Sequence, residues 1–221
     1  MSARDDILGT IRRSLGVTGN ERPRLTAVDE RIAAAPKGLV PERGNLAGAA
    51  LFDLFKAQAA ATLATLEEVD TLDKVPEAVA DYLRRGNLPA RARVGDALSG
   101  LPWGGTALEV TTGASDGRDL VAVNRAFGGV AETGTLALVS GPDSPTTLNF
   151  LPDYAIAVLK RSEITGDYET LWARLRERFG KGVMPRTVNW VTGPSRSGDI
   201  EQTILLGAHG PRSVHIIVVD D

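Results

Sequence analysis

Cysteine is absent from this sequence of 221 residues, and histidine occurs only twice, at His209 and His215. Without cysteine the chain cannot form disulfides, thiolate zinc sites or iron–sulfur clusters held by its own thiolates. Two histidines are also too few for the usual histidine-rich zinc site, although carboxylates remain as candidate ligands for Mg²⁺. We therefore expect no metal site and no cofactor bound by this chain itself.

A concentrated basic surface and a long apolar run are missing as well. The chain has 25 Lys and Arg against 28 Asp and Glu, a net charge of −3. This balance argues against nucleic-acid binding. No window approaches the ~20 apolar residues of a membrane helix, and the charged first 16 residues lack a signal-peptide core. We expect a cytoplasmic protein without a membrane span.

Nucleotide-binding and esterase signatures are absent too. The sequence contains no G-x-G-x-x-G, no Walker loop and no G-x-S-x-G. A nucleotide-binding Rossmann domain is therefore not supported.

The N-terminal region is expected to differ from the rest of the chain. Ile7, Leu8, Ile11 and Leu15 fall on one helical face that ends at Gly16. Residues 17–44 contain three prolines and little periodicity, which predicts an extended linker or surface loop. We expect an N-terminal helix and linker over 1–44 and one domain over 45–221. The helix either packs on its own domain or docks a partner chain.

The remaining pattern predicts an α/β domain with an open, mostly parallel sheet flanked by helices. The run 213–220 is almost continuously apolar, which indicates a strand buried on both faces. With the strand at 187–191 and a short helix over 200–207, it is expected to form a right-handed βαβ unit. Further strands are expected at 67–70, 91–94, 133–140 and 154–160, and helices at 45–66, 75–83 and 168–179.

The stretch VTGPSRSGDI, residues 191–200, is the first candidate site. It follows a strand, and ligands of open α/β sheets gather at the carboxyl ends of strands. In this stretch a glycine allows backbone amides to approach a ligand closely. Two serine hydroxyls and one guanidinium can donate hydrogen bonds to an anion, and an aspartate is expected to cap the next helix. The residues concerned are Gly193, Ser195, Arg196, Ser197 and Asp199, the last paired with Gln202. The alternative is that these residues only turn the chain and cap the helix.

The second candidate is Glu132, which lies between a glycine-rich turn and a strand, followed by Thr133, Gly134 and Thr135. Such a carboxylate is a base, a nucleophile or an acceptor for a ligand hydroxyl, or else a satisfied turn residue. The loop over 140–154 is expected to lie over the ligand end of the sheet.

The two histidines are expected to play structural roles. The turn containing His209 precedes the last strand, so it is expected at the end opposite the first candidate site. His215 lies within an apolar run and reads as a core or edge histidine.

Four motifs in order resemble one family. They are AETGTLAL (131–138), NFLPDYAIAVLK (149–160), TGPSRSGDIE (192–201) and GAHGP (207–211). Together they resemble the lactate-utilisation (LUD) domain family, in particular its single-domain type, lactate utilisation protein C. The resemblance implies a fold similar to the sugar-phosphate isomerase and CoA-transferase superfamily. It also implies oxidation of L-lactate to pyruvate in a three-protein system whose sister proteins carry iron–sulfur motifs.

Three functional hypotheses remain open, and whether the chain is an enzyme is not decided by its sequence. In the first, it is a subunit of the lactate-oxidising system with iron–sulfur partner subunits, and Arg196 and Ser195 bind a small carboxylate or other anion that Glu132 faces. Thr133, Gly134 and Thr135 are expected to belong to the same anion-binding site. In the second, it is a free-standing transferase or isomerase that uses Glu132 on a phosphorylated or CoA-linked substrate. In the third, it is an assembly module without catalysis.

Overall fold

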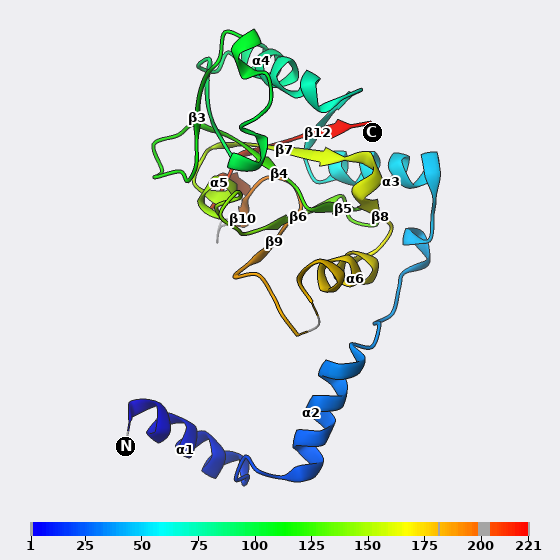
Figure 1. The fold of residues 1–221 in the computed structure, drawn as a ribbon, viewed down its shortest axis with the longest axis vertical. Coiled ribbons are helices and arrows are strands. Elements are labelled where there is room, and N and C mark those ends of the chain that lie inside the picture. Colours follow the sequence, from blue (N-terminus) through cyan, green and yellow to red (C-terminus); the bar gives the residue numbers. More distant parts are fainter. Residues whose placement is uncertain (1, 181, 199–203, 221) are drawn as a thin grey trace.

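The computed structural model describes residues 2–180, 182–198 and 204–220, built around a six-stranded sheet (Figure 1). All of its strands pair in parallel. Their spatial order is β1 (Thr65–Val69), β12 (Ser213–Val219), β7 (Tyr154–Lys160), β4 (Val121–Arg125), β2 (Arg91–Val94) and β3 (Glu109–Thr112). The predicted fold class is confirmed. Strands β7 and β12 lie inside the sheet, which explains their continuous apolar sequences.

Helices cover both faces of this sheet. Helix α4 (Val75–Arg85) packs Val79 and Leu83 against one face, in a cluster that includes Val123 and Ile217. Helix α3 (Gly48–Ala61) packs Phe55 on the opposite face, together with the second sheet. Side chains of β7 and β12 alternate between the two clusters, so both faces contribute to the core.

The second sheet has four strands. Their order is β8 (Ile164–Thr165), β5 (Gly128–Val130), β6 (Thr135–Val139) and β9 (Val188–Val191). Helix α6 (Tyr168–Phe179) covers the outer face of this sheet through Leu171. The prediction of a βαβ unit joining the strand at 187–191 to the strand at 213–220 is wrong. Strand β9 pairs antiparallel with β6 and does not share a sheet with β12.

A hairpin follows β9. Strand β10 (Arg196–Gly198) pairs antiparallel with β11 (Ile204–Leu206). The expected helix over 200–207 is therefore wrong for residues 204–206, where three consecutive aliphatic side chains adopt a strand. Asp199 and Gln202, expected to cap that helix, lie outside the described residues.

Two helices precede the domain and extend away from it (Figure 1). Helix α1 (Ala3–Leu15) begins with a Ser2–Asp5 capping box and ends at Gly16 in the left-handed conformation. Helix α2 (Arg22–Ala34) corrects the expectation of an extended linker over 17–44. Its proline lies in the first turn, where a missing N–H costs nothing.

The remaining elements are short. They are α5 (Thr147–Phe150), η1 (Glu42–Gly44), η2 (Leu72–Lys74), η3 (Asp96–Leu98), η4 (Trp103–Gly105) and η5 (Arg161–Glu163). Within residues 2–180, 182–198 and 204–220, no helix has the length and apolarity needed to span a bilayer.

Candidate functional site

A hollow of about 370 Å³ lies at the carboxyl end of β4, between the loop after β6 and helix α6. This is the end of an open α/β sheet where ligands usually bind. Its polar lining includes Arg125, Asp143, Ser144, Glu163, Arg174 and Arg178. Three guanidinium groups face two carboxylates, so the hollow carries a net positive charge.

The three arginines differ in how far their donors are used. Arg125 donates to both oxygens of Glu163 at 2.7 Å and to two backbone carbonyls. Arg174 Nη1 donates to the backbone oxygen of Glu163 at 2.9 Å. The Arg178 guanidinium lies over the rings of Phe127 and Phe179, each 5.6 Å from the ring centroid. Among the described residues Arg178 has no hydrogen-bond partner, so its N–H donors remain available for a ligand.

A buried amide network holds the loop over this end of β4. Asn124 Nδ2 donates to Ser144 Oγ at 2.9 Å and to Asn149 Oδ1 at 2.8 Å. Its Oδ1 accepts from the Arg125 backbone N–H at 2.9 Å. Gly95 leaves the room for this amide, because a Cβ there would lie 2.6 Å from Asn124 Oδ1. The expectation that loop 140–154 covers the ligand end of the sheet is confirmed for its first half.

Glu132 lies in the turn between β5 and β6 and is only 4% exposed. Its Oε1 accepts from the Tyr168 backbone N–H at 3.4 Å, at the first turn of α6, where helix amides lack partners. Its Oε2 is buried without a hydrogen-bond partner among the described residues. The hydroxyls of Thr133, Thr135, Thr192 and Tyr168 bond to one another at 2.7–3.0 Å. The cluster fixes the start of α6 against the second sheet, outside the hollow.

The glycines of the two candidate motifs pack against the same helix end. Gly134 has φ +65° and Gly193 has φ +71°. A Cβ on Gly134 would lie 2.3 Å from Ala59 N, and one on Gly193 would lie 2.1 Å from Thr62 O. Both positions therefore require glycine for close contact with the carboxyl end of α3, independently of any ligand.

The Ser195 loop lies beside the His209 turn. Ser195 N donates to Pro211 O at 2.8 Å, and Ser195 O accepts from Gly207 N at 2.9 Å. The expectation that the two segments lie at opposite ends is wrong, because these bonds join them directly. His209 is exposed in this turn.

The predicted anion-binding residues lie in two places, the turn into β6 (Thr133 to Thr135) and the loop and strand from Gly193 to Ser197. Arg196 is exposed on β10, opposite Leu206, and has no ion-pair partner in the part of the chain that the structure describes. Ser197 is half-buried opposite Leu205. Glu132, in contrast, is buried in the turn between β5 and β6. Anion binding by this hairpin remains a prediction. The helix expected over 200–207, whose first backbone amides were to bind the anion, is not formed at residues 204–206.

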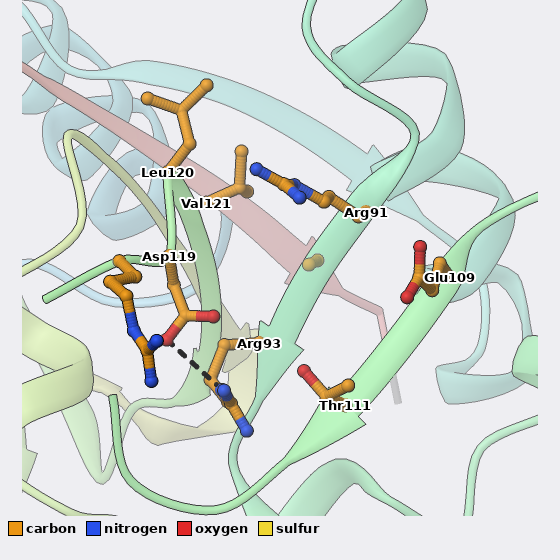
Figure 2. Close-up of a pocket in the computed structure, with 9 residues that line it drawn as sticks. Arg91, Arg93, Glu109, Thr111, Asp119, Leu120 and Val121 are labelled. Atoms are coloured by element: carbon orange, nitrogen blue, oxygen red, sulfur yellow. Dashed lines mark hydrogen bonds and ion pairs between the residues drawn. The ribbon is translucent and has the colours of Figure 1, made fainter. Parts of the chain in front are cut away.

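A second hollow, of about 410 Å³, lies at the amino ends of β2, β3 and β4 (Figure 2). Arg93 Nε donates to Asp119 Oδ2 at 3.1 Å, and Arg93 Nη1 donates to Thr112 O at the same distance. Arg118 pairs with Asp116. Because this hollow lies at the amino ends of the strands, away from the end where ligands of open α/β sheets bind, it is the weaker candidate.

The sequence reasoning missed the arginines of the first hollow. Arg174 and Arg178 are four residues apart on α6, so they project from the same side of the helix. That spacing was the available signal, but charged residues on one helix side are usually only solvated. Among the described residues, no group of three or more His, Asp or Glu side chains is placed to hold a metal ion.

Residues 121–219, from the start of β4 to the end of β12, match the LUD domain family. This segment is a LUD domain. The resemblance drawn from the four motifs is therefore confirmed for this part of the chain, and the domain boundary at residue 45 remains a prediction.

Two curated LUD proteins are similar in sequence to part of this chain. Lactate utilization protein C of Shouchella clausii is 36% identical over 92 residues, 42% of this chain and 40% of that protein. Lactate utilization protein C of a Geobacillus species is 40% identical over 93 residues, 42% of this chain and 39% of that protein. The matches thus span about two fifths of the length of these curated relatives.

A solved structure supports the fold. The crystal structure of a DUF162 family protein from Deinococcus radiodurans superposes with a TM-score of 0.57 and 23% identity. The superposition covers 79% of this chain and 99% of that one. At this identity the similarity supports the architecture alone.

Proposed function

We propose that this chain takes part in lactate utilisation, as a subunit of a cytoplasmic system that oxidises L-lactate to pyruvate. Two relatives named lactate utilization protein C support the role. We further propose that the hollow at the carboxyl end of β4 binds a small carboxylate. The observation that carries this second part is the Arg178 guanidinium, which faces the hollow with its donors unused by the described residues.

The lining suits a small hydroxy or keto acid. A guanidinium binds a carboxylate through two parallel hydrogen bonds, and Arg174 adds positive charge one helical turn away. Phe127 and Phe179 provide apolar surface for a methyl group. The Ser144 hydroxyl offers a hydrogen bond to a substrate oxygen. The volume lies at the lower end of the range of small-molecule sites.

Electron transfer from lactate is proposed to involve partner subunits. Oxidation of lactate to pyruvate releases two electrons and two protons. Because this chain has no cysteine, it cannot hold an iron–sulfur cluster through its own thiolates. In this proposal the chain binds and orients the carboxylate, and iron–sulfur partner proteins accept the electrons.

The transferase hypothesis has less support. A nucleophile must reach its substrate, whereas Glu132 is 4% exposed and does not line the hollow. Its carboxylate instead accepts from the first turn of α6.

Arg178→Ala is expected to weaken L-lactate or pyruvate binding about 10- to 100-fold, because a hydrogen bond to a charged group contributes about 1.5–3 kcal/mol. Arg196→Ala is the matched control, since it removes an exposed arginine outside the hollow. Isothermal titration calorimetry of both variants with L-lactate, pyruvate and phosphate measures the effect. Loss of binding in Arg196→Ala, with Arg178→Ala unchanged, would move the site to the β10–β11 hairpin.

A further inference from the structure

The N-terminal arm, defined here as α1 and α2 with their connection (residues 3–34), buries none of its residues against the domain. Figure 1 shows both helices standing away from the two sheets. Each helix nevertheless exposes three large aliphatic side chains. They are Ile7 (60%), Ile11 (48%), Leu15 (64%), Leu25 (47%), Val28 (51%) and Ile32 (58%).

These side chains form one stripe on each helix. In α1 they are spaced four residues apart, and in α2 they follow an i, i+3, i+7 pattern, so each set shares one face. Helices of 13 residues are marginal in water, and amphipathic helices gain most of their stability by packing the apolar face. The arm therefore has the properties of a docking element whose receiving surface lies on another chain.

Net charge distinguishes two surfaces of a second copy on which the arm could pack, namely its arm and its domain. The arm, residues 3–34, contains six arginines and five Asp or Glu, a net charge of +1, whereas residues 45–221 carry −5. Pairing two arms would bring like net charges together, whereas packing an arm on the domain of a second copy brings opposite net charges together.

The domain also exposes an apolar surface of suitable character, here called the β11–α5 patch. It consists of Phe150, Leu151, Leu205 and Leu206, which are 39–52% exposed. Gly210 lies beside both parts, because a Cβ there would lie 3.8 Å from Phe150 Cδ1 and 3.4 Å from Ser195 Cβ, and Ser195 O accepts from the N–H of Gly207, which follows Leu206. Successive strand side chains project to opposite faces, so Leu205 and Leu206 do not both share a face with Phe150.

We propose that the chain forms a homodimer in which the N-terminal arm of each copy packs its aliphatic stripes on the β11–α5 patch of the other. Such an arrangement is symmetric, because arm and patch of both copies are used once each. The inference does not depend on lactate binding by the hollow.

Light scattering after size exclusion tests the dimer with the full chain. At about 100 µM, a concentration at which micromolar affinity saturates, the protein is expected at twice the 23.4 kDa of one chain. Ile11→Asp and, separately, Leu206→Asp are expected to weaken dimerisation at least tenfold. Thr10→Asp adds the same charge on the neighbouring side of α1 and is expected to leave the dimer intact. Since Ile11 and Leu206 are exposed in one chain, melting curves of diluted protein should remain unchanged.

Salt separates the arm-on-domain arrangement from pairing of two arms. Raising NaCl from about 50 to 500 mM is expected to weaken the dimer, because screening reduces attraction between opposite net charges. A monomeric wild-type protein, or a dimer indifferent to Ile11→Asp, would overturn the proposal. A dimer that salt strengthens, or one indifferent to Leu206→Asp, would overturn the assignment of the receiving surface.

Discussion

Replacing Gly134 by alanine is expected to lower the free energy of unfolding by about 3 kcal/mol. Gly134 has φ +65°, a conformation that costs alanine about 1 kcal/mol or more. The added Cβ would also lie 2.3 Å from Ala59 N and 2.6 Å from Gln58 C. These are backbone atoms of α3, so relief requires the helix to move away from the second sheet and from the core residues that it covers.

Gly113→Ala is the matched control for this effect. Gly113 also has a positive φ, +92°, but a Cβ there would meet no heavy atom within 4 Å. The control variant should lose only the conformational part, about 1 kcal/mol. Urea denaturation monitored by tryptophan fluorescence measures both losses. Equal losses for the two variants would show that contact with α3 does not explain why residue 134 is glycine.

Lowering the pH from 6.5 to 4 is expected to remove up to about 3 kcal/mol of stability through His215 alone. Burial lowers the pKa of His215 to about 4, and the charge of Arg85 adds to the shift. The folded protein therefore holds the neutral imidazole, whereas the unfolded chain binds a proton near pH 6.5. The contribution is complete above pH 6.5 and is lost as the pH falls toward the folded pKa.

The surroundings of His215 explain why it stays neutral. The ring is stacked on Tyr82 at 4.2 Å, and its Nδ1 lies 2.8 Å from Thr65 Oγ1. Its Nε2 lies 3.8 Å from Glu67 Oε2, but that carboxylate also pairs with Arg85, whose positive charge offsets it. Desolvation by Tyr82 and the interior of the sheet therefore outweighs attraction to Glu67.

Denaturation at a series of pH values separates His215 from the other titrating groups. In His215→Gln, the stability lost between pH 6.5 and 4 should shrink by about 3 kcal/mol relative to the wild type. His209→Gln changes an exposed histidine and should follow the wild-type profile. Parallel profiles for His215→Gln and the wild type would contradict the buried neutral state.

Local sequence predicts those strands and helices whose own pattern of apolar residues is sufficient to identify them. The continuous apolar run of β12 indicated a central parallel strand, and α6 followed from its apolar spacing. The prediction of β9 in the same sheet as β12 is wrong, because a four-residue strand can pair in either the six-stranded or the four-stranded sheet. The choice depends on β6, about 50 residues earlier in the chain.

The candidate site was harder to predict than the fold. Arg178 becomes a ligand-binding candidate only because α6 lies beside the end of β4 and a loop held by Asn124. None of these contacts is visible in local sequence. Conversely, Gly134 and Gly193 stand out in the sequence, and the structure explains both by packing on α3.

A crystal structure of the protein with saturating L-lactate would show directly where the substrate binds. Lactate is expected in the hollow at the carboxyl end of β4, with its carboxylate on the guanidinium of Arg178. Lactate bound at Arg196 on the β10–β11 hairpin, or an empty hollow in crystals of protein shown to bind lactate in solution, would contradict this expectation.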